Sequence, residues 1–173
     1  MGFLGTVLYN IRNMKKAGKF RAMDTEELLA FDDEKFYDAI ECVCEDAVYD
    51  IKAPELTQEQ IFVYSLIQFE IEVNNGGLCQ FFVNSSSECA PYISQALEAV
   101  GAASLKTLYD DFIRENQIDV NDLSSFKIDD VEEYEAQTER FDFDSFDDHF
   151  YDDADLHQQI IDYARKHIGQ IIK

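Results

Sequence analysis

Residues 61–73 read IFVYSLIQFEIEV, a run that places apolar side chains on every side of a helix. A helix that is apolar all round has to be enclosed by other elements. Thr57 and Gln60 fit the Ser/Thr-x-x-Glu/Gln pattern that caps a helix start. Ile67 to Val73 also alternates apolar and polar residues, which leaves a short strand as the alternative there. Length and the capping pattern favour a central buried helix over residues 58–73.

The composition around this run favours more helices. The 173 residues are 46% hydrophobic and 13% aromatic, with only two Pro and seven Gly, too few for a turn-rich sheet protein. We predict an all-α, single-domain bundle with one core. The expected helices span residues 3–17, 25–31, 33–50, 58–73, 76–84, 91–100, 103–116, 129–142 and 155–171.

Charge divides the chain unevenly. Residues 1–23 hold five basic and no acidic residues, which predicts a basic, apolar N-terminal helix that shares one core with the rest. Residues 24–173, the predicted acidic helical domain, hold 36 acids against nine basic residues. Such a charge repels nucleic acid and anionic membranes and attracts basic proteins. General acidity for solubility is the alternative explanation.

The four cysteines, Cys42, Cys44, Cys79 and Cys89, form no C-x-x-C pair. No signal peptide pattern precedes them, and no run reaches the length of a membrane span. We therefore predict free thiols and a cytoplasmic location.

An acidic segment from Asp110 to Asp155 holds eighteen Asp and Glu against three Lys and Arg. Disordered acidic tails lack aromatic residues, whereas this segment contains Tyr134, Phe141, Phe143, Phe146, Phe150 and Tyr151. We expect it to fold and to present a fixed carboxylate surface. On the expected helix 129–142, one anchored face carries Val131, Tyr134, Thr138 and Phe141, and a neighbouring row carries Glu132, Glu135, Glu139 and Asp142.

The central helix is followed by the sequence NNGGLCQFFVN over residues 74–84. Asn75 and Gly76 can take positive φ where a helix stops, and Gly77 allows close backbone approach. We predict a structural corner between two buried helices, in which the amides of Gln80 and Asn84 satisfy the freed backbone groups. Amides are poor acids and bases, so catalysis is not expected there.

These residues closely resemble the N-G-G-F-x-Q-[FY]-[FY]-x-N signature of a bacterial family of uncharacterised acidic domains that includes an all-helical DNA-mimic protein. The matching residues are Asn75, Gly76, Gly77, Gln80, Phe81, Phe82 and Asn84, and Leu78 stands where Phe is usual. Residues 143–151, FDSFDDHFY, resemble the family's F-D-x-L-D-D-x-F-Y, with Phe146 in place of Leu. The resemblance implies a helical fold, self-association as a homodimer, and DNA mimicry.

Metal-site patterns are incomplete. Asp142, Asp144 and Asp153 fit three positions of a calcium-loop template, but Phe146 and Asp147 stand where an oxygen ligand and a Gly are required. His149, Asp153 and His157 would share a helix face without an H-E-x-x-H motif. We predict no metal and no cofactor.

We therefore predict a binding protein, not an enzyme, that occupies the DNA-binding surface of a basic protein such as a transcriptional regulator. An immunity protein against a basic nuclease toxin is the alternative within the binding class. A metal-dependent hydrolase using His149, Asp153 and His157 is the alternative of another class. The predicted partner-binding residues, called the acidic surface below, are Asp129, Asp130, Glu132, Glu133, Glu135, Glu139, Asp142, Asp144, Asp147 and Asp148.

Overall fold

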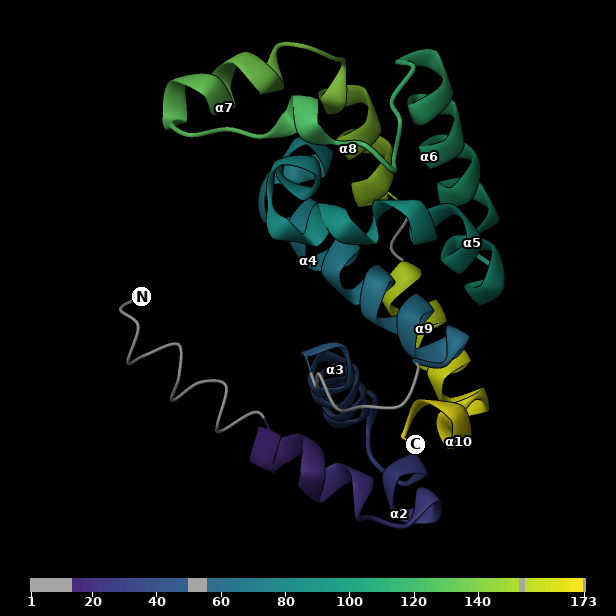
Figure 1. Cartoon of the computed structure of the whole chain (residues 1–173). Helices are drawn as coiled ribbons and strands as arrows, with labels where there is room; N and C mark the ends of the chain where they lie inside the picture. The colour runs from purple at the N-terminus through teal and green to yellow at the C-terminus, as the bar shows by residue number, and fades with distance from the viewer. Residues whose placement is uncertain (1–13, 50–55, 153–154, 173) are drawn as a thin grey trace. The chain divides into compact units, whose positions relative to one another are not determined.

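The computed structural model describes residues 14–49, 56–152 and 155–172, and every regular element within these ranges is helical (Figure 1). This confirms the all-α fold class. Contacts divide the chain into two compact units. Unit 1 contains the described residues up to Tyr64 and from Ile161 onward, and unit 2 runs from Ser65 to Ile160. The division into a basic helix over residues 1–23 and an acidic domain stays a prediction.

The elements follow one another with short connections. In chain order they are a helical segment over residues 14–21, α2 (Thr25–Leu29), α3 (Asp33–Tyr49), α4 (Gln58–Val83), the 3-10 helix η1 (Ser85–Cys89), α5 (Ala90–Val100), α6 (Ala103–Glu115), the 3-10 helix η2 (Ser124–Phe126), α7 (Val131–Thr138), α8 (Phe143–Asp152), α9 (Leu156–Lys166) and α10 (Ile168–Ile171). The expected helix over 3–17 begins among residues outside the described ranges, and its described part continues to residue 21.

The central helix and its cap are confirmed. In α4, the side chains of Phe62, Val63, Leu66, Ile67 and Phe69 are buried. The short strand considered for residues 67–73 does not form, because these residues lie inside α4.

The start of α4 is fixed by the predicted capping pattern in unit 1. Gln60 N donates to Thr57 Oγ1 at 3.1 Å, and Thr57 N donates to Gln60 Oε1 at 3.0 Å. The Gln60 amide also donates to the Ile171 carbonyl at 2.9 Å, so the cap residue ties α4 to α10. A second tie joins α9 to the start of α3, where Arg165 donates to the Phe31 carbonyl and to Asp33.

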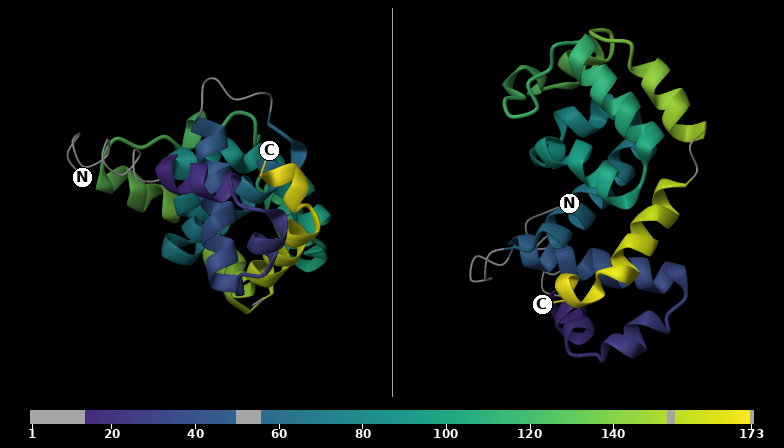
Figure 2. Two further views of the ribbon diagram at one scale, coloured as in Figure 1. Left: turned by 90° about the horizontal axis from the view of Figure 1, so that it is seen from below. Right: turned by 90° about the vertical axis from the view of Figure 1, so that its right-hand side faces the viewer.

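Unit 2 is built around the Phe69 ring of α4. This ring makes edge contacts with the rings of Phe81, Tyr109, Phe146 and Phe150, at centroid distances between 5.1 and 6.4 Å. Phe69 and Phe81 lie on α4, before and after its kink at Gly76 and Gly77, and the other rings lie on α6 and α8. Helix α6 packs against both α5 and α8 (Figures 1 and 2). Aromatic packing therefore holds together elements that carry the signature and the acidic segment.

The predicted helix over 129–142 is wrong in its extent. The structure has α7 ending at Thr138, a turn, and a separate helix α8 starting at Phe143. Arg140 lies at this break, where its guanidinium donates to the Ser125 carbonyl at 3.1 Å and lies over the Phe126 and Phe141 rings, and Asp142 caps the new helix. The predicted helix over 155–171 likewise divides into α9 and α10.

Candidate partner-binding acidic surface

The kink in α4 lies at the signature glycines. Gly76 has φ −162° and ψ 27°, and Gly77 has φ 76° and ψ −179°. The conformation of Gly77 is accessible almost only to glycine. The expectation of positive φ at Asn75 and Gly76 was therefore wrong, since Gly77 alone carries it in this motif.

Three side chains of the acidic segment satisfy the backbone groups that the kink frees. Asp147 Oδ1 accepts from the Leu78 N–H at 2.8 Å. The Tyr151 hydroxyl donates to the Val73 carbonyl at 2.8 Å, and the Tyr134 hydroxyl reaches the Gly76 carbonyl at 3.5 Å. The two stretches that resemble family motifs are thus joined by hydrogen bonds, and we call Tyr134, Asp147 and Tyr151 the kink clamp.

The signature amides have a different role from the one predicted. Gln80 and Asn84 donate to Glu72 Oε2 at 2.7 and 2.8 Å, and the Ser86 hydroxyl donates to Glu72 Oε1 at 3.1 Å. The amides therefore bind the Glu72 carboxylate, which lies before the kink in α4, and leave the backbone groups to the kink clamp. Both sets of contacts join the two sides of the corner.

Nine of the ten residues of the acidic surface are exposed, and Asp147 is half-buried. Burial is the main cause that raises the pKa of Asp147, and the neighbouring Asp144 and Asp148 charges add to it, while the Leu78 N–H acts in the opposite direction. Asp147 thus differs from the other nine, because its carboxylate faces the kink.

Three other members of the acidic surface form helix caps. Asp130 accepts from the Glu133 N–H at 2.9 Å, and Glu133 accepts from the Asp129 N–H at 2.7 Å, which together form a reciprocal cap on α7. Asp142 accepts from the Ser145 N–H at 3.2 Å and caps α8. Among the described contacts, no hydrogen bond or ion pair involves the carboxylates of Glu132, Glu135, Glu139, Asp144 and Asp148.

The anchoring of this surface comes from α8 and not from α7. Phe143, Phe146 and Phe150 of α8 are buried, whereas α7 has no buried residue and lies at the edge of unit 2 (Figures 1 and 2). The prediction that Val131 belongs to an anchored face is wrong, because 72% of Val131 is exposed. Polar contacts hold α7 instead, including a 2.7 Å hydrogen bond from Gln137 to the Ser125 carbonyl.

Comparison with protein families gives a match to the DMP19-like protein family over residues 54–167. The matched region covers more than half of the chain. The chain belongs to the DMP19-like protein family. No curated protein and no solved structure matches the chain.

The DMP19-like region includes the kink, the kink clamp and the whole acidic surface. The roles of Glu72 and of the two tyrosine hydroxyls were not recognised from the sequence. A signal for them was present, because a glycine corner inside a buried helix leaves backbone groups that need partners. The partners lie 58 to 78 positions away in the chain, so spacing alone could not identify them.

The two histidines of the metal-dependent hydrolase alternative have other contacts within the DMP19-like region. His149 Nδ1 lies 2.6 Å from the Ser145 carbonyl, and His157 Nδ1 lies 3.2 Å from Glu70. Asp153, the third residue of that hypothesis, lies outside the described residues. No group of three His, Cys, Asp or Glu side chains placed for a metal occurs in the part of the chain that the structure describes.

The four cysteines are free and buried, which agrees with the prediction of free thiols. Within the described ranges, none of the helices combines the length and the apolar character needed to cross a bilayer.

Proposed function

We propose that this chain is a DNA-mimic-type binding protein whose acidic surface occupies the DNA-binding surface of a basic protein. The observation that carries the proposal is the set of five exposed carboxylates without hydrogen bonds or ion pairs among the described contacts, Glu132, Glu135, Glu139, Asp144 and Asp148. Asp144 and Asp148 stand on α8, whose rings are buried, and α7 is held by its cap and by the hydrogen bond from Gln137 to Ser125. A fixed array of this kind can pair with Lys and Arg without first losing the entropy of a flexible tail.

Charge spacing supports the proposal. Glu132 and Glu135 lie on α7 and Glu139 is its C-terminal cap, so successive carboxylates are about 5 Å apart along the axis at 1.5 Å per residue. One strand of duplex DNA places a phosphate about every 3.4 Å. Asp144 and Asp148 on α8 add a second group of exposed charges.

The expected partner is a cytoplasmic basic protein that binds DNA, such as a transcriptional regulator. Membership of the DMP19-like family supports this class of partner. The signature around Gly76 and Gly77 resembles that of a family of acidic domains that includes a DNA mimic. The net charge of −22 opposes direct binding to nucleic acid or to an anionic membrane. The proposed function needs neither a cofactor nor a catalytic step.

Competition with DNA tests the proposal. Basic proteins are captured from a lysate on the immobilised chain, identified, purified and titrated with duplex DNA in the presence of the free chain. DNA and the chain should displace each other, and affinity for the chain should fall as salt rises. A captured protein that binds DNA and the chain at the same time would contradict the proposed function.

A further inference from the structure

An apolar groove lies inside the acidic surface. It has a volume of about 330 Å³ and is lined by Ile128, Asp129, Asp130, Val131 and Tyr134. Val131 is 72% exposed, and Ile128 and Tyr134 are half-buried. Exposed apolar surface of Val131 therefore lies beside the carboxylates of Asp129 and Asp130.

The groove has a defined shape because the reciprocal cap of α7 fixes its wall. The cap hydrogen bonds join Asp129 to Glu133 and Asp130 to Glu133 directly beside Val131. The Tyr134 hydroxyl is directed toward the Gly76 carbonyl, which leaves the ring as part of the groove lining. The lining is therefore held by the same contacts that hold the start of α7.

The position of the groove selects the kind of side chain that it can take. It lies at the N-terminal end of α7, beside the Asp130 cap. Its lining is mostly apolar, from Ile128, Val131 and the Tyr134 ring, so an apolar side chain gains most from covering it. The carboxylates of Asp129, Glu132 and Glu135 around it suit Lys and Arg that flank such a side chain.

We propose that this groove binds one apolar side chain of a basic recognition helix, with the flanking Lys and Arg pairing with the surrounding carboxylates. In duplex DNA, the C5-methyl of thymine offers an apolar contact in the major groove, between two phosphate backbones. The γ-methyl groups of Val131 occupy the equivalent chemical position here, an apolar contact bordered by carboxylates. The inference rests on the proposed function and adds a contact that charge alone does not provide.

Synthetic helical peptides test the groove separately from the charge. Three peptides carry the same net positive charge and have Leu, Ser or Arg at one central position. In the Arg peptide, one flanking Lys is also replaced by Gln to keep the charge equal. Their affinities are measured by fluorescence anisotropy against the full chain, against Val131→Ser, and against Ile71→Ser. Ile71 is a matched control because it is also an exposed apolar residue, at 43%, and lies on α4.

The full chain should bind the Leu peptide about fivefold more tightly than the Ser peptide, as expected for burial of one apolar contact. Val131→Ser should abolish this preference, and Ile71→Ser should retain it. Equal binding of the Leu and Ser peptides by the full chain, or a preference that survives Val131→Ser, overturns the groove proposal. Tightest binding of the Arg peptide that depends on Val131 also overturns it, because the groove would then hold a cation.

The peptide experiment distinguishes this inference from the proposed function. If all three peptides bind equally and DNA competes with the captured partner, the groove proposal fails and the charge-based function stands. If none of the peptides binds and the captured partner binds DNA and the chain at the same time, both the groove proposal and the proposed function fail.

Discussion

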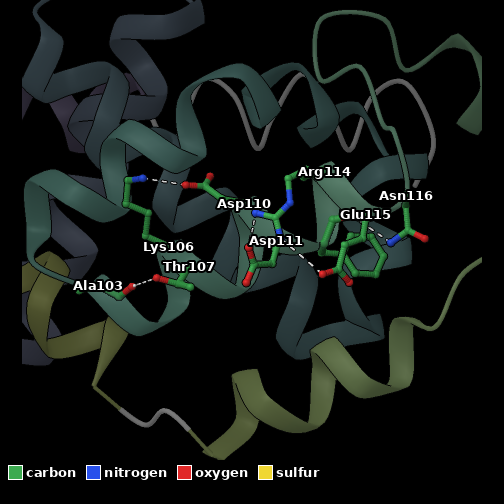
Figure 3. A network of polar contacts seen from close by, with 9 residues as sticks. Ala103, Lys106, Thr107, Asp110, Asp111, Arg114, Glu115 and Asn116 are labelled. Atoms are coloured by element: carbon green, nitrogen blue, oxygen red, sulfur yellow. Dashed lines mark hydrogen bonds and ion pairs between the residues drawn. The ribbon is translucent and has the colours of Figure 1, made fainter.

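Helix α6 and the segment of α7 and α8 are both acidic, but they use their carboxylates differently. On α6, Asp110 pairs with Lys106, while Asp111 and Glu115 pair with Arg114, all on the same helix (Figure 3). On α7, Glu132, Glu135 and Glu139 have no such partner among the described contacts. A high density of acids therefore does not itself mark a binding surface, and pairing distinguishes the two regions.

The two regions also differ in how they are held. Leu105, Tyr109 and Phe112 bury one face of α6, and the Tyr109 hydroxyl donates to the Ala90 carbonyl at 3.1 Å. Helix α7 buries none of its residues and depends on polar contacts to the kink and to Ser125. We expect changes at the kink to loosen α7 and α8 while leaving α6 in place.

Replacement of Gly77 by Ala should give the largest effect. A Cβ at this position would lie 2.1 Å from Asp147 Oδ2, and the backbone conformation is accessible almost only to glycine. We expect a loss of about 3 kcal/mol in the free energy of unfolding, measured by urea denaturation. Hydrogen exchange should increase in residues 131–152 more than in α6.

Gly76→Ala is the matched control for this change. Its φ of −162° is open to any residue, and the nearest atom to a new Cβ is Gln80 Oε1, the end of a flexible side chain. We expect a loss of about 1 kcal/mol, from the weakened Gln80–Glu72 hydrogen bond. Equal effects of the two substitutions would show that the kink clamp does not explain the need for Gly77.

Asp147→Ala should have the next largest effect, about 2 kcal/mol, because the Leu78 N–H loses its acceptor. Asp147→Asn retains an acceptor oxygen and should cost less. A similar loss for both variants would indicate that charge, and not the hydrogen bond, is the contribution of Asp147.

The pH dependence of the same residue follows from its raised pKa. The folded chain holds this proton more tightly than the unfolded chain, so the contribution of Asp147 to stability falls as pH rises from the ordinary value of 3.8 through the raised value. Wild-type stability relative to Asp147→Asn should therefore increase as pH is lowered through that window. A difference that does not change with pH would contradict the raised pKa.

Arg114→Ala should have the smallest effect. Its pairs with Asp111 and Glu115 are exposed to solvent, and exposed pairs contribute little to stability. We expect no measurable change in the free energy of unfolding. A clear destabilisation would mean that pairing on α6 is structural, which would weaken the contrast with α7.

The features predicted from the sequence are those that depend on neighbouring residues. The buried run from Ile61 and the cap formed by Thr57 and Gln60 are local patterns, and both are found in the structure. The break between α7 and α8 was missed, and its residue Arg140 contacts Ser125, fifteen positions away, which helical spacing does not reveal. Periodicity continued through the break and gave no sign of it.

The acidic surface was predictable as a set of exposed charges but not as an arrangement. Its exposure follows from composition, and nine of its ten residues are exposed. Asp147 is half-buried because it contacts Leu78 at the kink. Leu78 lies 69 positions earlier in the chain, so the sequence gives no sign of this contact. The exposure of Val131 was also missed, because helical spacing grouped it with ring residues that have other contacts.

We propose that the carboxylates of α7 that have no partner among the described contacts, and not acidity in general, bind the basic partner. Two triple variants test it most directly, Glu132→Gln/Glu135→Gln/Glu139→Gln on α7 and Asp110→Asn/Asp111→Asn/Glu115→Gln on α6. Each removes three negative charges, and affinity for the captured basic partner is measured for both. We predict that the α7 variant loses about tenfold in affinity, from three contacts of about 0.5 kcal/mol each, while the α6 variant binds as the wild type does. Equal losses in both variants, or no loss in the α7 variant, would contradict the account.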